Sequence, residues 1–279
     1  MPTGSFPVMA DDQTNNDLLV ERDGHIMILT MNRPERFNAL SGAMLIRMYD
    51  AYEEASNDVD IRCIVVTGSG GNFCAGADLR AMAGDAKDGD PMDTASRMAE
   101  DPDIVYKALF RHYRPTKPIV AAVEGVAIAG GTELLQAMEI RVAGESARFG
   151  VSEARWSLYP MGGSAVRLPR QIPYTQAAEI LLTGKHLLAP EAKEIGLIGH
   201  VVPDGEALEK ALEIARVVAE NGPLSTAAIT RTLHECDGME LDDALRHEWD
   251  YGQAVFASND AKEGPKAFAE KRSPNFTGT

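Results

Sequence analysis

The chain has 279 residues, an apolar fraction of 44% and a formal net charge of −15, from 27 Lys and Arg against 42 Asp and Glu. This length and composition predict a folded protein with a sizeable core, either one large domain or a core with a small appendage. The negative charge disfavours nucleic acid and anionic membranes as partners, because both would repel it. An anionic ligand would need cations that are concentrated locally.

The cysteines and the apolar stretches indicate the compartment. Cys63, Cys74 and Cys236 have neither CxxC nor metal-like spacing, and an odd count fits reduced thiols in a cytoplasm. The first residues lack the basic start and apolar run of a signal peptide. The most apolar stretch, 119–129, is too short to span a bilayer. We therefore expect a cytoplasmic protein, and the scattered histidines predict no metal site.

The N-terminal part is predicted to contain strands, one helix and a glycine loop. Residues 1–16 are polar and typical of a flexible tail. Two strands joined by a turn at Asp23-Gly24 are expected in 18–31, and Ser41 can cap an amphipathic helix through Ala55. A buried strand at 61–67 then precedes a loop at 68–78 that leads into a helix, and residues 81–95 indicate a long loop.

A second unit of the same kind follows a helix that ends before Pro115. Residues 118–129 predict a buried strand that passes Gly125, and Gly130-Gly131 then opens a helix. The shared order in 64–79 and 119–134 suggests a coiled succession of β-β-α turns. Two short strands are expected at 140–144 and 147–150.

The chain is predicted to be helical from Pro173 onward. The expected helices are 175–182, 189–195, 205–221, 224–236, 241–256 and 260–271. A helical tail of about seventy residues cannot bury itself as a single layer, so it should pack on the core or on a neighbouring subunit. The expected division is a tail at 1–16, a core with the site at 17–205 and a C-terminal helical region at 206–279.

Two glycine loops are candidate anion sites. The first N–H groups of a helix have no intrahelical partner, so those at Gly130 could hold a carbonyl that becomes an oxyanion. Taken alone, a tight turn is the more frequent explanation, and the same alternatives apply to the loop around Gly76-Ala77. Two such loops favour function, because an oxyanion hole needs two converging donors. Residues 68–73 lack the third glycine of a dinucleotide fingerprint, and no P-loop lysine follows.

Two glutamates are candidate acid–base groups. Glu133 lies three residues after Gly130, on the same side of the helix mouth, where its apolar neighbours predict burial. A glutamate at a helix start usually complements only the dipole, and Glu153 alone would be an ordinary loop residue. A pair of carboxylates around one water is what acid–base addition of water requires. Cys74 is expected to be a packed thiol, and the run from Gly162 to Ser164 fails the nucleophile-elbow pattern.

Several segments in order resemble the crotonase (enoyl-CoA hydratase/isomerase) superfamily. Residues 72–79 resemble its first oxyanion motif, 121–133 its second, and 148–153 with 159–163 the segment that carries a second acid. Later family markers are matched at 182–184, 192–197 and 267–272. The resemblance extends from about Leu18 to Phe276, and the actinobacterial enoyl-CoA hydratases look most similar.

This resemblance implies an α/β fold, a crotonase-like spiral of β-β-α units with a C-terminal helical region, assembled as a homotrimer or a dimer of trimers. The N–H groups of Ala77 and Gly130 would bind the acyl thioester oxygen. Glu133 would hold and activate the water that adds across the 2,3 double bond, and Glu153 would supply the proton at C2. No metal or redox cofactor is implied, since coenzyme A is part of the substrate.

The resemblance also implies contacts with coenzyme A and the acyl chain. These are Arg36, Asn38, Ala39, Leu40, Ala75, Asp78, Leu79, Arg80, Gly131, Trp156, Tyr159, Pro160 and Met161, with Phe268 and Lys271 reaching over from the C-terminal helix of this or another subunit. A few local cations would suffice for the phosphates, although ordinary solvated surface is the alternative for Arg80 and Lys271. Ala129 and Met161 stand where many members have glycine. We expect Ala129 to be harmless and Met161 to favour a bulky or branched acyl group, such as a steroid-derived one.

The expected activity is that of an enoyl-CoA hydratase in fatty-acid or steroid side-chain β-oxidation. One alternative is a double-bond isomerase on the same fold, which typically manages with one carboxylate. Another is a catalytically silent acyl-CoA-binding subunit. The presence of both Glu133 and Glu153 favours hydration over either.

Overall fold

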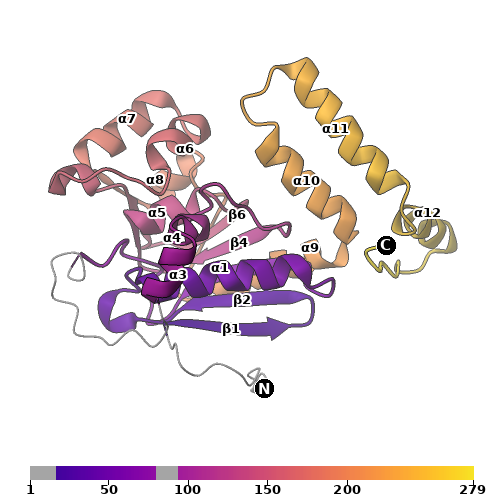
Figure 1. Ribbon diagram of the computed structural model, residues 1–279, viewed down its shortest axis with the longest axis horizontal. Helices are drawn as coiled ribbons and strands as arrows, with labels where there is room; N and C mark the ends of the chain where they lie inside the picture. Colours follow the sequence, from indigo (N-terminus) through magenta and orange to yellow (C-terminus); the bar gives the residue numbers. More distant parts are fainter. Residues whose placement is uncertain (1–16, 80–93) are drawn as a thin grey trace.

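The computed structural model describes residues 17–79 and 94–279 (Figure 1). Arg80 and most of the loop predicted at 81–95 lie outside these residues. Within the described part, no helix is both long and apolar enough to cross a membrane.

The strands form two sheets. The larger has the order β1-β2-β3-β4-β6-β9 and the smaller has the order β5-β7-β8. Their bounds are β1 Leu18–Asp23, β2 Ile26–Met31, β3 Cys63–Gly68, β4 Ile119–Val123, β5 Val126–Ile128, β6 Ile140–Gly144, β7 Arg148–Gly150, β8 His186–Leu188 and β9 His200–Val202. In the large sheet only β1 and β2 pair antiparallel. The parallel strands β3 and β4 are almost wholly buried, which explains their continuous apolar sequences.

The chain alternates between the two sheets as it advances. Strand β4 of the large sheet is followed by β5 of the small one, and β6 is followed by β7. After β3, Cys74 makes an isolated parallel bridge with Ala127 of β5, so the first glycine loop joins the small sheet in the same way. This alternation confirms the predicted α/β class and the predicted succession of β-β-α units.

Most of the predicted helices are present in the structure. Their bounds are α1 Gly42–Asn57, α3 Thr94–Glu100, α4 Ile104–Ala108, α5 Gly130–Leu135, α6 Ser164–Gln171, α7 Tyr174–Thr183, α8 Ala189–Glu194, α9 Ala207–Glu220, α10 Pro223–Glu235, α11 Leu241–Phe256 and α12 Asp260–Glu270, with short 3-10 helices η1 Pro34–Arg36 and η2 Glu153–Trp156. The predicted cap of α1 is confirmed, because Ser41 Oγ accepts a hydrogen bond from Met44 N at 3.0 Å. Such a cap contributes about 1 kcal/mol.

Three elements correct the prediction for the middle of the chain. Helix α6 begins at Ser164, before the expected start of the helical part at Pro173, and contains Pro169. Strands β8 and β9 interrupt the stretch that was expected to be only helical. Each is three residues long, too short to show a period, and exists because it pairs with β7 or β6.

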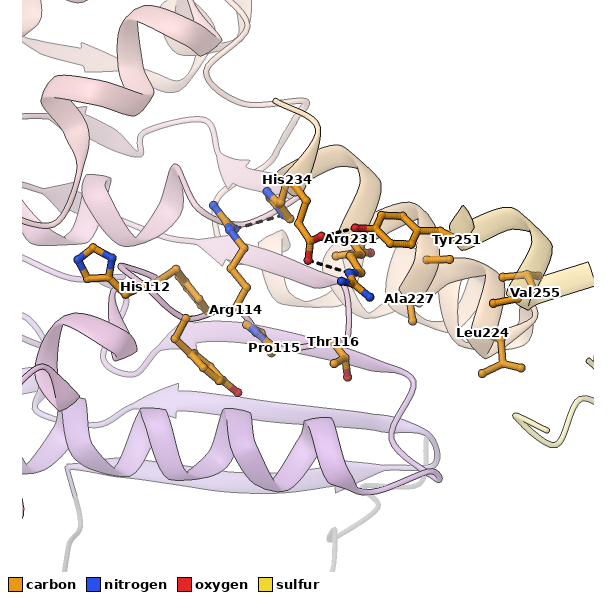
Figure 2. Close-up of a pocket in the computed structure, with 16 residues that line it drawn as sticks. His112, Arg114, Pro115, Thr116, Leu224, Ala227, Arg231, His234, Tyr251 and Val255 are labelled. Carbon is orange, nitrogen blue, oxygen red and sulfur yellow. Dashed lines mark hydrogen bonds and ion pairs between the residues drawn. The ribbon is translucent and has the colours of Figure 1, made fainter. Parts of the chain in front are cut away.

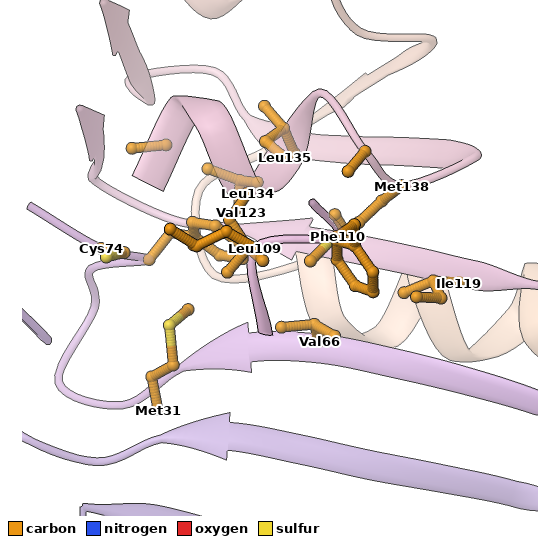
Figure 3. Packing of buried hydrophobic residues seen from close by; sticks show 14 of the residues in the cluster. Met31, Val66, Cys74, Leu109, Phe110, Ile119, Val123, Leu134, Leu135 and Met138 are labelled. Atoms are coloured by element: carbon orange, nitrogen blue, oxygen red, sulfur yellow. The ribbon is translucent and has the colours of Figure 1, made fainter. Parts of the chain in front are cut away.

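Both faces of the large sheet are covered. On one face β2 directs Ile26 and Ile28 toward α9, whose alanines at every fourth position, 207 to 219, lie against the sheet. Small side chains in this row let the helix approach the strands closely. The other face packs on α1, α4 and α5, and Leu134, Leu135, Phe110 and Val123 belong to one buried cluster there (Figure 3). Helix α5, which carries Glu133, is therefore held in the centre of the main core.

Helices α10 and α11 pack on each other and extend away from the sheets, with α12 beyond them (Figure 1). Helix α11 buries none of its residues, and Trp249 and Phe256 are 68% and 79% exposed. Within the C-terminal helical region, α9 packs on the large sheet, whereas the core leaves most of α10, α11 and α12 uncovered.

Candidate active site

The candidate site is a cavity of about 480 Å³ between the two glycine loops, α5 and η2. Among the residues predicted from the sequence, Leu40, Ala75, Ala77, Leu79, Gly130, Glu133, Glu153, Trp156, Tyr159 and Met161 line it. Leu45, Val105, Tyr106, Leu109, Ile128 and Leu158 add an apolar wall that was not predicted. An apolar cavity with a few convergent polar groups is typical of a small-molecule site.

Backbone pairing aims two N–H groups at the cavity. Leu40 N donates to Gly76 O at 2.8 Å and Asp78 N donates to Leu40 O at 3.3 Å, so the intervening N–H of Ala77 points away from Leu40. Gly130 is the first residue of α5, where no intrahelical acceptor exists. Neither N–H finds an acceptor in residues 17–79 or 94–279.

The two loops touch each other at these donors. A Cβ built on Gly76, whose φ is +92°, would lie 2.9 Å from Gly130 N. A Cβ on Gly130 would lie 3.5 Å from Ala77 N. Glycine at both positions therefore lets the two N–H groups converge, as an oxyanion hole requires. Ala129 precedes the second donor with φ +53° and ψ −123°, a conformation that glycine favours, so the alanine costs backbone strain there.

Several predicted contact residues have structural partners instead of lining the cavity. Asn38 is buried, and its amide donates to Ser69 O at 2.9 Å and Asn72 O at 2.7 Å. Asp78 forms an ion pair with Arg33 at 3.0 Å. These interactions hold the loop that presents Ala77.

Gly131 serves packing. A Cβ at Gly131 would lie 2.3 Å from Cys74 O, so the glycine allows α5 to touch the first loop. Cys74 itself is buried, which raises the pKa of its thiol to about 12 and makes it unreactive.

The remaining predicted contacts lie beside or away from the cavity. Arg36, Ala39 and Pro160 do not line it. Phe268 contributes to a groove around His25 at the opposite end of β2, and neither it nor Lys271 lines the cavity in the same chain. Arg80 lies outside the described residues.

Glu133 is fixed by the start of α6. Its Oε2 accepts from Gly162 N and its Oε1 from Ser164 N, each at 3.0 Å. Burial raises the pKa of Glu133, while these N–H groups and the nearby Arg167 oppose the rise. Sequence reasoning missed this role of Gly162 and Ser164. The Gly-Gly-Ser run before an amphipathic helix was the available signal, because it marks a helix start, where backbone N–H groups lack intrahelical partners.

Glu153 has a different environment at the first residue of η2. Burial, together with the smaller effect of the Glu133 charge, raises its pKa to about 7. Its Oε2 is buried and has no hydrogen-bond partner among the described residues. The cavity thus holds one carboxylate with two hydrogen-bond donors and a second one that titrates near neutral pH.

A larger hollow of about 780 Å³ lies between the segment before β4 and helices α10 and α11 (Figure 2). In it Arg114 contacts His234 at 3.2 Å, and Glu235 accepts from Arg231 at 2.7 Å and from Tyr251. These polar groups satisfy one another, and the hollow contains neither glycine loop. No group of three or more His, Cys, Asp or Glu suited to a metal occurs in the described part of the chain.

Comparisons with known proteins point to one family. The family model described as enoyl-CoA hydratase/isomerase matches residues 21–279. Enoyl-CoA hydratase EchA19 of Mycobacterium tuberculosis is 57% identical over 268 residues, 96% of this chain and 99% of that protein. The 2,3-dehydroadipyl-CoA hydratase of Escherichia coli is 34% identical over 263 residues, 94% of this chain and 99% of that protein.

A solved structure agrees with this placement. The crystal structure of enoyl-CoA hydratase EchA1 from Mycobacterium marinum matches with a TM-score of 0.85 and 38% identity, covering 95% of this chain and 100% of that chain. Sequence and fold therefore place the chain in the enoyl-CoA hydratase/isomerase family of enzymes.

Proposed function

We propose that the protein is an enoyl-CoA hydratase that adds water syn across the 2,3 double bond of a trans-2-enoyl-CoA and forms a 3-hydroxyacyl-CoA. The observation that carries the proposal is the joint presence in one cavity of Glu133, Glu153 and two backbone N–H groups that have no acceptor in the described part of the chain. An isomerase needs only one carboxylate to move a proton, whereas hydration uses one to activate water and one to protonate carbon.

The proposed mechanism follows from these positions. The thioester oxygen binds the N–H groups of Ala77 and Gly130, each worth roughly 3 kcal/mol of barrier as negative charge develops there. Glu133 removes a proton from water, whose oxygen bonds to C3. Glu153 donates its proton to C2 and becomes a carboxylate. The starting state returns when the proton that Glu133 took from water is released and Glu153 is protonated again. These steps need no metal or redox cofactor.

The proposed substrates are thioesters of fatty acids or steroid side chains, handled in β-oxidation. Trp156, Tyr159 and Met161 line the cavity and are 67%, 66% and 47% exposed. They offer apolar surface at its mouth, which supports a bulky acyl group. Coenzyme A is proposed to lie along the loop that carries Arg36, which joins the first glycine loop through Ala75 N and Phe37 O at 3.0 Å.

We also propose self-association as a homotrimer or a dimer of trimers. The support is the apolar surface that the C-terminal helices leave uncovered, including Trp249, Phe256 and Phe268. In such an assembly α12 of a neighbouring subunit could bring Phe268 and Lys271 to a cavity that they do not reach within one chain.

The function is tested by the loss of conjugated-enoyl absorbance when purified protein is mixed with crotonoyl-CoA, longer enoyl-CoA esters and steroid-like ones. The product should be the 3-hydroxyacyl-CoA. A protein that binds these esters and hydrates none of them contradicts the proposal. Conversion of a 3-enoyl-CoA to the conjugated ester without hydration would identify the isomerase instead.

A further inference from the structure

Ser152 and His186 form a polar contact behind the second carboxylate. Ser152 Oγ lies 2.7 Å from His186 Nε2. Ser152 is buried, lines the cavity and directly precedes Glu153, whereas His186 lies at the surface on β8. The contact thus links the cavity wall to the edge of the small sheet.

The packing around this contact is tight. His186 faces Gly150 of β7 in the strand register, and a Cβ on Gly150 would lie 2.4 Å from His186 Cδ2. The ring therefore occupies space that any other residue at position 150 would fill. At the other end of η2, Arg155 Nε donates to Thr183 O at 3.2 Å. Helix η2 is fastened to the α7–β8 segment on both sides.

These contacts of η2 affect the position of the Glu153 carboxylate. Ser152 directly precedes Glu153 in the chain, and Glu153 Oε2 has no hydrogen-bond partner among the described residues. The orientation of the carboxylate therefore depends on the backbone at Ser152 and Glu153. Burial raises the pKa of this carboxylate, and the backbone at these two residues opposes the rise.

We infer that Ser152 and His186 are positioning residues that hold Glu153 in the geometry for proton donation at C2. This inference rests on the proposed hydratase function. The charged groups that act on His186 are Arg148 of β7 and Arg155 of η2, and with desolvation they lower the pKa of its ring. The ring is neutral at pH 7, so its Nε2 can accept a hydrogen bond from the Ser152 hydroxyl group.

The test is a double-mutant cycle with Ser152→Ala and His186→Phe. Each substitution removes the same hydrogen bond, so each should lower kcat about tenfold with little change in KM. The double variant should be no slower than the slower single variant, because the two side chains act through one interaction. The basic limb of the pH profile should move to higher pH, because a displaced Ser152 backbone would no longer oppose the rise in the pKa of Glu153.

Matched variants separate positioning from general damage. Ser152→Thr keeps the hydroxyl and should keep most of the rate. His200→Phe makes the same change at another exposed histidine on a three-residue strand, and should leave kcat and the pH profile unchanged. If His186→Phe does not fold, the comparison of kcat between Ser152→Ala and Ser152→Thr decides, because only the alanine variant should be slow.

Additive losses, or an unchanged kcat in Ser152→Ala, overturn the inference while wild-type hydration continues. A wild-type protein without hydration would instead overturn the proposed function.

Discussion

Glu133 and Glu153 line one cavity, and the charge of Glu133 adds to the larger effect of burial in raising the pKa of Glu153. Their surroundings push them toward different states. Glu133 receives two backbone hydrogen bonds at the start of α6, which favour its ionised form. One buried oxygen of Glu153, in contrast, has no hydrogen-bond partner among the residues that the structure describes. Pairs of acids in such contrasting environments commonly divide the roles of base and acid. This contrast supports Glu133 as the base and Glu153 as the proton donor.

The two glutamates should be essential for turnover. Glu133→Gln and Glu153→Gln keep size and polarity but remove the acid–base group, so each should lower kcat about a thousandfold. Far-ultraviolet circular dichroism should show an unchanged fold. Glu220→Gln, at the exposed end of α9, is the control and should be fully active. Wild-type rates in both active-site variants would contradict the two-carboxylate mechanism.

The rate should have a basic limb near neutral pH. Proton donation requires protonated Glu153, whose pKa is about 7. Above that value kcat/KM should fall about tenfold per pH unit, because this ratio reports the free enzyme. Glu133 must be ionised, and burial raises its pKa above the ordinary value, so the acidic limb should lie above that of a free glutamate. A profile that is flat to pH 9 would exclude Glu153 as the donor.

Gly76 and Gly71 provide a matched pair for testing the oxyanion hole. Both have positive φ, +92° and +74°, but a Cβ on Gly71 meets none of the described residues within 4 Å, whereas one on Gly76 would lie 2.7 Å from Ala129 Cβ and 2.9 Å from Gly130 N. Each alanine variant should lose about 1 kcal/mol of unfolding free energy from backbone strain, and Gly76→Ala should lose more because its Cβ also clashes with these atoms. Only Gly76→Ala should also lower kcat, by about a hundredfold, because it displaces the two donors. Chemical denaturation and steady-state kinetics of both variants measure the two effects separately. Equal kcat values in the two variants would argue against the hole.

Ala129→Gly should stabilise the protein. At φ +53° and ψ −123°, glycine avoids the strain of a Cβ, and the free energy of unfolding should rise by about 1 kcal/mol. The control Ala127→Gly, at the buried central residue of strand β5, should destabilise because it removes core contact and adds unfolded-state freedom. Thermal unfolding of both variants measures the difference. A lower melting temperature for Ala129→Gly would show that contact of its methyl group with the Gly76 loop outweighs the strain.

The sequence by itself determined the features that local pattern encodes. The hairpin of β1 and β2, the Ser41 cap and the buried run of β4 all follow from residue preference and periodicity, and the structure has them. The hairpin turn lies at Gly24-His25, one residue later than the predicted Asp23-Gly24, because Asp23 still pairs with Ile26. The family motifs located both glycine loops and both glutamates along the chain. Such patterns report what a segment buries and how it begins.

Only the tertiary structure decided which segments meet. Strands β8 and β9 form because β7 and β6 pair with them. Each has only three residues, too few for a sequence pattern that would predict a strand. Gly162 N and Ser164 N donate to Glu133, which lies about thirty residues away in sequence. Ser152, just after β7, contacts His186 on the paired strand β8. A hydrogen bond between distant residues leaves no periodic trace in the chain, because it depends on how sheets and helices pack. The sequence therefore located the candidate acid–base groups, and packing determined their surroundings and their orientation.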